Sequence, residues 1–194
     1  MSELAMHEID RLKENLAERA AAEGLIDVSY RLVDSPVGQL MLAATGRGIV
    51  RVAFAAEDFD AVLDSLAEKV GVRVLHRAAP LDAAAMQLDE YFAHARTGFE
   101  LNLDHRLSSG YRLEVQLALP RIEYGHTASY KAMAAVTGRP AAVRAVGTAC
   151  ATNPLPILVP CHRVLRSDGS LGGYLGGLDA KRALLSLEQD PFGN

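Results

Sequence analysis

The chain has 194 residues, with 20 Lys and Arg against 24 Asp and Glu and 49% hydrophobic residues. This composition is ordinary for a globular protein and excludes a disordered or collagen-like chain. Its apolar runs are far shorter than the ~18 residues of a membrane span, and the first residues lack a signal-peptide pattern. Two cysteines, Cys150 and Cys161, allow neither a disulfide framework nor a four-cysteine zinc site. We therefore expect a cytoplasmic protein with reduced thiols, no membrane contact and no metal or other cofactor.

Charge is divided unevenly along the chain. Residues 1–104 hold 10 Lys and Arg and 18 Asp and Glu, whereas residues 105–194 hold 10 and 6. The first half is therefore acidic by eight charges and the second half basic by four. A basic half indicates contact with a polyanion such as nucleic acid. A chance distribution of surface charge is the alternative that these counts leave open.

The first half predicts a helical extension and a small α+β domain. Apolar residues at helical spacing predict an amphipathic helix over 7–23, and we assign 1–24 to an extension. Alternation predicts strands at 26–32, 39–44 and 49–54, with a turn at Ser35–Gly38. Helices are predicted at 57–69 and 81–95, and a short strand at 99–103. Residues 25–104 thus form an N-terminal domain without evident chemistry, in which His76 and His94 are surface or packing residues.

A polar stretch at 104–110 is the expected linker to a second domain, residues 105–194. Helical patterns follow at 111–119, 129–137 and 140–151. The last two are joined by a short turn containing Gly138, which is typical of a helix-turn-helix. Pro140 is expected in the first turn of the second helix, where its fixed φ is favourable. Plain helical packing is the alternative interpretation of this pair.

The most informative stretch is Asn153 to Val164, NPLPILVPCHRV. Two prolines prevent a helix, and a short aliphatic run then places Cys161 beside His162. A thiol with an ordinary pKa near 8.5 is mostly protonated at neutral pH, and an adjacent imidazole held by a carboxylate activates it. A buried packing cysteine is the plain alternative. A zinc site is less favoured because no second Cys or His lies at ligand spacing.

Further motifs surround that pair in a defined order. They are Ser129-Tyr130, Gly138-Arg139-Pro140, Arg144-Ala145-Val146-Gly147, Asn153-Pro154, Pro160-Cys161-His162-Arg163-Val164, Gly172-Gly173-Tyr174, Gly176-Gly177-Leu178, Lys181 and Leu184-Leu185-Ser186-Leu187-Glu188. With them, residues 110–189 closely resemble the O6-alkylguanine-DNA alkyltransferases, and the Ser35–Gly38 turn extends a weaker resemblance into the first half. The resemblance implies an α+β protein. Its N-terminal α/β domain would be ribonuclease H-like, and its C-terminal helical, winged-helix-like domain would carry the helix-turn-helix, DNA binding and alkyl transfer.

The resemblance also implies five catalytic residues. Cys161 would be the nucleophile, His162 its base acting through water, and Glu188 the group that orients and charge-stabilises the imidazole. Asn153 would brace the turn that holds Cys161. Tyr130 would supply a proton or hydrogen bond to the departing guanine. The alternatives are a packing role for Tyr130 and a surface position for Glu188 on a C-terminal helix.

The implied partner is double-stranded DNA containing O6-alkylguanine, approached through the minor groove with the damaged base flipped out, and the protein is expected to act as a monomer. DNA would be contacted by Ser129, Ala142 and Arg144, and Arg144 would fill the gap left by the base. A simple phosphate contact is the alternative for Arg144. The base would be bound near Tyr174, Leu175, Lys181 and Val164.

Departures from the family pattern concern the shape of the pocket. Gln116 stands where a bulky residue is usual, and Leu175 where a small one is usual. Pro120 falls inside an expected helix, which we predict to end early or kink. None of these removes a proposed catalytic group.

Three other functions stay open at this stage. They are a non-catalytic alkyltransferase-like protein that binds lesions, a DNA-binding regulator and a cysteine hydrolase. Cys161 argues against the first, and the chain shows no cysteine-rich metal domain for the second. A hydrolase needs an oxyanion hole, for which no candidate is found.

Overall fold

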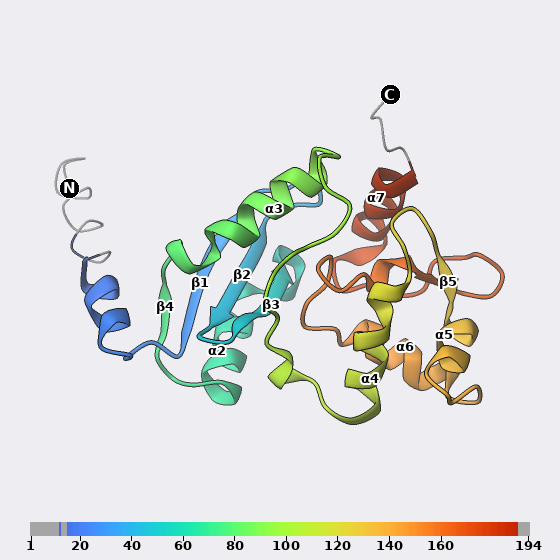
Figure 1. Cartoon of the computed structure of the whole chain (residues 1–194), viewed down its shortest axis with the longest axis horizontal. Coiled ribbons are helices and arrows are strands. Elements are labelled where there is room, and N and C mark those ends of the chain that lie inside the picture. The colour runs from blue at the N-terminus through green and yellow to red at the C-terminus, as the bar shows by residue number, and fades with distance from the viewer. Residues whose placement is uncertain (1–11, 13–14, 190–194) are drawn as a thin grey trace.

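The computed structural model describes residue 12 and residues 15–189, coloured along the chain in Figure 1. Residues 15–22 are helical, in agreement with part of the helix predicted at 7–23; the rest of that prediction lies outside the described residues. Leu12 and Leu16 are 59% and 69% exposed, whereas Ala17 is buried. Two of the apolar residues at helical spacing therefore lie on the exposed side of this segment.

Four strands form the sheet of the N-terminal domain. They are β1 (Val28–Val33), β2 (Leu40–Thr45), β3 (Gly48–Phe54) and β4 (Val74–His76), in the order β3-β2-β1-β4. β1 and β3 both pair antiparallel with β2, and β4 pairs parallel with β1. The first three strands confirm the prediction from alternation. β4 was not predicted, because it is a short edge strand with two exposed residues.

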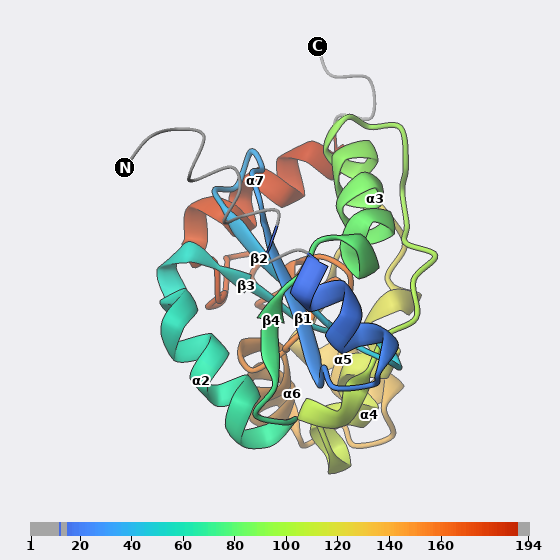
Figure 2. The same ribbon diagram turned by 90° about the vertical axis from the view of Figure 1, so that its left-hand side faces the viewer.

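Helices α2 (Phe59–Lys69) and α3 (Asp82–Phe92) confirm the two predicted in this half. They cover opposite faces of the sheet, as Figure 2 shows. Leu66 of α2 belongs to the same buried cluster as Met41, whereas Leu88 of α3 belongs to the cluster of Leu42. Successive side chains of β2 point to opposite faces of the sheet and therefore belong to two separate buried clusters.

The strand predicted at 99–103 is wrong. This segment forms only an isolated bridge between Ile49 and Leu103. The amide of Ile49 donates to the carbonyl of Asn102 at 2.8 Å. Gly48, at φ +137°, lies so close to the Asn102 backbone that a Cβ would overlap it, so only glycine permits this approach.

The expected linker is an anchored segment. Asp104 is 5% exposed, accepts a hydrogen bond from the Thr45 hydroxyl at 2.6 Å and caps a short 3-10 helix, η3 (His105–Leu107). The connection between the halves is therefore fixed to the end of β2.

The C-terminal domain contains α4 (Gly110–Ala118), α5 (Tyr130–Val136), α6 (Val143–Ala151) and α7 (Gly177–Gln189). Two short strands, β5 (Ala128–Ser129) and β6 (Val164–Leu165), pair in parallel. Pro120 lies in a 3-10 turn, η4 (Leu119–Arg121), directly after α4. The predicted early end of that helix is confirmed, since proline cannot continue the hydrogen-bond ladder.

Helices α5 and α6 form the predicted helix-turn-helix pair. The expectation for Pro140 is wrong, because α6 begins at Val143 and Pro140 lies in the turn before it. Gly138, at φ +73°, provides the left-handed turn after α5.

The two domains share one buried cluster, which contains Leu42 of the sheet as well as Val115 of α4 and Leu155. The amide of Val52 in β3 also donates to the carbonyl of Pro154 at 2.9 Å. The sheet therefore packs directly against the segment that leads to Cys161. Over the part of the chain described, no helix is both long and apolar enough to cross a membrane.

Candidate active site

The segment after α6 holds Cys161 in a tight, buried turn. Asn153 is 1% exposed, its side-chain oxygen accepts from the amide of Leu155 at 3.1 Å, and its side-chain nitrogen donates to the carbonyl of Val159 at 2.9 Å. The same nitrogen donates to Cys161 Sγ at 3.2 Å. One amide side chain thus ties both ends of the turn to the sulfur, in the position expected for a brace.

Cys161 begins a 3-10 turn, η5 (Cys161–Arg163), and is 1% exposed. Burial raises the pKa of its thiol to about 11, although the hydrogen bond from Asn153 and the charge of Lys181 oppose the rise. The resting sulfur is therefore protonated at neutral pH. Its reaction requires a group that accepts the proton.

His162 and Glu188 form a buried pair next to this thiol. His162 is 0% exposed, and its Nε2 lies 2.9 Å from Oε1 of Glu188. Glu188 is 3% exposed, so the alternative of a surface carboxylate on α7 is wrong. An ionised Glu188 holds the imidazole hydrogen on Nε2, which leaves Nδ1 as an acceptor. Nδ1 is buried and has no hydrogen-bond partner among the described residues.

Glu188 also accepts hydrogen bonds from two residues to which the sequence patterns assign no role. Arg163 donates from Nε to Oε2 and from Nη2 to Oε1, both at 2.8 Å. Tyr91 of α3 donates from its hydroxyl to Oε1 at 2.6 Å. The end of α3 lies beside α7 in both views (Figures 1 and 2). The first half therefore contributes to the site, contrary to the expectation that it carries no chemistry.

A role for Arg163 could have been predicted from the sequence, because it directly follows His162 in the Pro160–Val164 motif. A role for Tyr91 could not, because it lies 97 positions from Glu188 and its neighbours Phe92 and Phe99 make it look like an ordinary core aromatic. Only the fold brings its hydroxyl to the carboxylate.

Electrostatics at this cluster favour neutral His162 in the resting protein. Burial would raise the pKa of Glu188, but hydrogen bonds from His162 and Arg163 overcome it and lower the pKa to about 2. Burial lowers the pKa of His162 against the pull of Glu188, and the Arg163 charge adds to this. Because Arg163 already neutralises the carboxylate, a standing imidazolium is not favoured. The directions of these shifts favour a protonated Cys161 thiol and a neutral His162 imidazole in the resting protein.

Lys181 and Val164 lie beneath the same turn. Lys181 is 0% exposed, and its ammonium donates to the Val164 carbonyl at 2.7 Å. Burial lowers the pKa of Lys181, while its charge lowers the pKa values of Cys161 and Cys150. A buried cation close to the sulfur stabilises negative charge that develops there. Cys150 is buried on α6, and burial raises the pKa of its thiol.

Tyr130 and Tyr174 come from two other elements. The Tyr174 ring lies edge-on to His162 at 6.4 Å and to Phe54 at 5.5 Å. Burial raises the pKa of Tyr130 to about 12, with smaller effects from the two cysteines. A Cβ on Gly172 would lie 2.1 Å from the Tyr130 hydroxyl, so a side chain at this position would force Tyr130 to move.

The residues expected to contact DNA lie on the helix-turn-helix. Ser129 caps α5, its hydroxyl accepting from the Ala132 amide at 3.0 Å, and Ala142 is the residue before α6. Arg144 is exposed in the first turn of α6, and its side chain forms no ion pair with any described residue. It is therefore available to an external partner.

Leu175 lies where the two domains meet. Its side chain lines a cavity of about 730 Å³ between the two domains, with Arg51 and Pro154. Neither Cys161 nor His162 lines that cavity. Leu175 is therefore one of the residues at the boundary between the two domains.

Comparison with known protein families gives two matches. Residues 28–105 match the family "6-O-methylguanine DNA methyltransferase, ribonuclease-like domain", and residues 111–190 match "6-O-methylguanine DNA methyltransferase, DNA binding domain". The two ranges together cover most of the chain.

Individual relatives agree with these matches. The chain is 38% identical over 162 residues to the methylated-DNA–protein-cysteine methyltransferase of Mycobacterium tuberculosis, covering 84% of this chain and 93% of the relative. It is 38% identical to the constitutive enzyme of that name from Bacillus subtilis, covering 82% and 94%. Among solved structures, M. tuberculosis OGT in complex with DNA matches with a TM-score of 0.73 and 38% identity, covering 84% of this chain and 94% of that one.

Proposed function

Because the chain belongs to the 6-O-methylguanine DNA methyltransferase family, we propose that it repairs DNA by moving the methyl group of O6-methylguanine to Cys161. The observation that carries the assignment of residues is the buried His162–Glu188 pair at 2.9 Å, directly after a thiol held by Asn153 at 3.2 Å. This is the arrangement of a nucleophile, a base and a group that orients the base.

The chemistry balances with the groups present. Sγ of Cys161 attacks the methyl carbon, an S–C bond forms, and the bond from that carbon to O6 breaks. The electron pair of the broken bond passes to guanine. His162 accepts the thiol proton during the attack, since both groups start neutral, and this proton ultimately replaces the methyl group on guanine. Glu188 stabilises the transient imidazolium, and Lys181 and Asn153 stabilise charge on sulfur.

Tyr130 is suited to assist the departing base. A phenol with a pKa near 12 keeps its proton at neutral pH, so it donates a hydrogen bond to a guanine that is gaining negative charge. We assign the loop that contains Gly172 and Tyr174 as the wall of the base pocket. Gly172 permits close contact with Tyr130, and Tyr174 lies beside His162.

The substrate is duplex DNA carrying the lesion. The alkyl group on O6 lies inside the base stack, so a buried thiol reaches it only after the nucleotide is extruded. Helices α5 and α6 are the elements that we assign to the minor groove, with Ser129 and Ala142 at their starts. Arg144, exposed on the first turn of α6, fills the space left by the base.

The product is a thioether, which has no easy route back to a thiol, so each molecule acts once. A non-catalytic lesion-binding protein is the alternative. The alternative is disfavoured because Cys161 is present and is followed directly by its proposed proton acceptor, His162, which Glu188 holds in place.

Intact-protein mass after incubation with a duplex containing O6-methylguanine tests the proposal. The expected result is one added methyl group per molecule, located on Cys161 by peptide mapping. Cys150→Ser is the matched control and retains transfer, whereas Cys161→Ser binds the duplex and gains no methyl group. Methyl on Cys150, or several turnovers per molecule, contradicts the proposal.

A further inference from the structure

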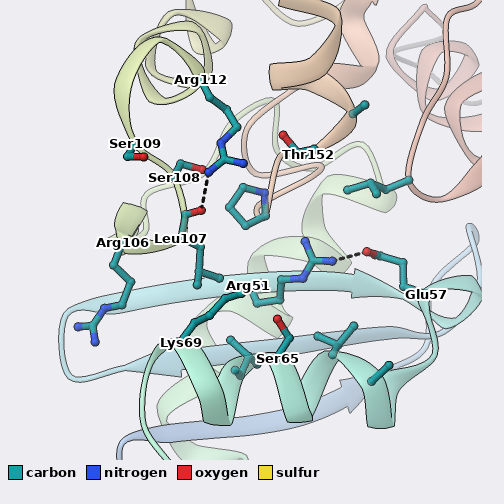
Figure 3. Close-up of a pocket in the computed structure, with 16 residues that line it drawn as sticks. Arg51, Glu57, Ser65, Lys69, Arg106, Leu107, Ser108, Ser109, Arg112 and Thr152 are labelled. Carbon is teal, nitrogen blue, oxygen red and sulfur yellow. Dashed lines mark hydrogen bonds and ion pairs between the residues drawn. The ribbon is translucent and has the colours of Figure 1, made fainter. Parts of the chain in front are cut away.

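The cavity between the two domains is lined by neither Cys161 nor His162 and has its own chemistry. Its volume is about 730 Å³, within the range of about 300–1,000 Å³ for small-molecule sites. Four cationic side chains line it, against the single carboxylate of Glu57. Figure 3 shows Arg51 entering from the sheet and Arg112 from the α4 side.

Two of the cations are already paired, and two are not. Arg51 forms an ion pair with Glu57, which also accepts from the Phe54 amide at 2.9 Å. Arg106 pairs with Asp104 at 2.7 Å and points away from the other cations in Figure 3. Lys69 and Arg112 have no ion pair with any residue that the structure describes. The cavity therefore carries uncompensated positive charge.

Buried donors at the cavity also lack acceptors. Ser108 is 6% exposed, and its hydroxyl has no hydrogen-bond partner among the described residues. Nε of Arg112 is also buried without a hydrogen-bond partner among the described residues. Its Nη2 donates only a long hydrogen bond, of 3.4 Å, to the Leu107 carbonyl. Buried polar groups are nearly always hydrogen-bonded. Two such donors therefore belong to residues that line one cavity, where an acceptor from outside the chain would satisfy them.

The start of α4 adds backbone donors. α4 has nine residues, and its N-cap residue is Ser109, which lines the cavity. The Ser109 side chain makes no capping hydrogen bond to the helix amides. The first amides of a helix are unpaired and carry positive partial charge, so they attract anions. At the other end of the cavity, Thr152 covers the end of α6 by donating from its hydroxyl to the Thr148 carbonyl at 2.8 Å.

We infer that this interdomain cavity binds a small molecule bearing phosphate groups, held by Lys69 and Arg112 from opposite domains together with Ser108. A phosphate group supplies the acceptors and the negative charge that these donors lack. The volume exceeds that of a single phosphate ion, which favours an oligophosphate or a nucleotide-sized ligand.

DNA is the other source of phosphate, and the geometry disfavours it. Arg144 lies in the first turn of α6, whereas the cavity is lined by Ala151 at the last. A helix of this length separates its ends by about 13 Å. The residue assigned to the flipped-base gap and the cavity therefore lie at opposite ends of α6.

Calorimetric titration with inorganic tripolyphosphate at constant ionic strength tests the inference. The wild type is expected to bind one equivalent saturably. Lys69→Gln and Arg112→Gln each remove one charged donor and should weaken binding about tenfold or more. Lys69 is exposed on α2, so its substitution does not threaten folding.

Arg47→Gln is the matched control, because Arg47 is equally cationic, exposed in the β2–β3 turn and absent from the cavity. It should bind tripolyphosphate as the wild type does. Equal weakening in all three variants, or binding that never saturates, overturns the inference as general charge attraction. The same variants are also titrated with undamaged duplex DNA. If Lys69→Gln and Arg112→Gln weaken only the binding of this DNA and not that of tripolyphosphate, the inference is overturned, because the phosphates are then those of the DNA backbone. The titration does not depend on methyl transfer, so the two proposals fail separately.

Discussion

Replacing Tyr91 by Phe removes one oxygen atom from the contact between the two domains. The ring is 0% exposed and packs against Phe99 at 5.2 Å and Tyr124 at 6.0 Å, and Phe retains those contacts. What is lost is a 2.6 Å hydrogen bond to the ionised Oε1 of Glu188. The substitution therefore isolates that bond.

The expected cost follows from the charge on the acceptor. A hydrogen bond to an ionised group contributes about 1.5–3 kcal/mol, against about 1 kcal/mol for a neutral pair. Tyr124→Phe is the matched control, because the Tyr124 hydroxyl donates to a neutral carbonyl, that of Leu187, at 3.3 Å. A loss of about 2 kcal/mol in Tyr91→Phe lowers Tm by about 4–8 °C in a chain of this size, and Tyr124→Phe should lower it by less than half as much.

Tyr91→Phe also changes the base. Oε1 of Glu188 accepts from both Tyr91 and His162, so removing the hydroxyl strengthens the pull of the carboxylate on the imidazole. The pKa of His162 then rises. Because neutral His162 accepts the thiol proton, the acid limb of the single-turnover rate against pH should move to higher pH by about half a unit, roughly 0.7 kcal/mol. Thermal unfolding and methyl-transfer rates measured on both variants decide the matter. Equal Tm losses with an unmoved acid limb would refute the link between Tyr91 and the base.

Three further predictions concern other residues. The pKa of Glu188 is about 2 in the folded protein and 4.5 without the protein environment. The ionised carboxylate therefore contributes about 3 kcal/mol to the free energy of unfolding above pH 4.5, and this contribution is lost as the pH falls toward 2. Acid-unfolding curves of Glu188→Gln should lack this loss, and a pH dependence like that of the wild type would contradict the assignment. Arg144→Lys keeps the charge but not the planar guanidinium, so it should slow repair of duplex DNA far more than reaction with free O6-methylguanine; equal slowing on both excludes a role in extrusion. Leu175→Ala should lower Tm, because it removes a side chain from the domain interface, and should leave the ratio of rates on O6-methyl- and O6-benzylguanine unchanged; a selective gain on the benzyl adduct would place Leu175 in the base pocket.

Local sequence patterns determined the elements whose cause is local. Alternating residues predicted β1 to β3, and helical spacing predicted α2 to α6. Pro120 ends α4 because it has no amide hydrogen to continue the helix. The Cys161–His162 pair was equally accessible, since the two residues are adjacent and their chemistry is specific. Glu188 entered only through resemblance, because nothing in its own neighbourhood distinguishes it from a surface residue of a helix.

The tertiary structure alone decided how those groups are charged and what supports them. Whether Cys161 and His162 rest as ions or as neutral groups depends on burial and on Arg163, and neither effect can be read from the motif. Tyr91 reaches Glu188 across 97 positions because α3 and α7 meet when the sheet packs against the second domain. β4 and the 99–103 segment were misjudged for the same reason, since edge pairing depends on neighbours far along the chain. The reactive pair is a property of local sequence, whereas its protonation is a property of the fold.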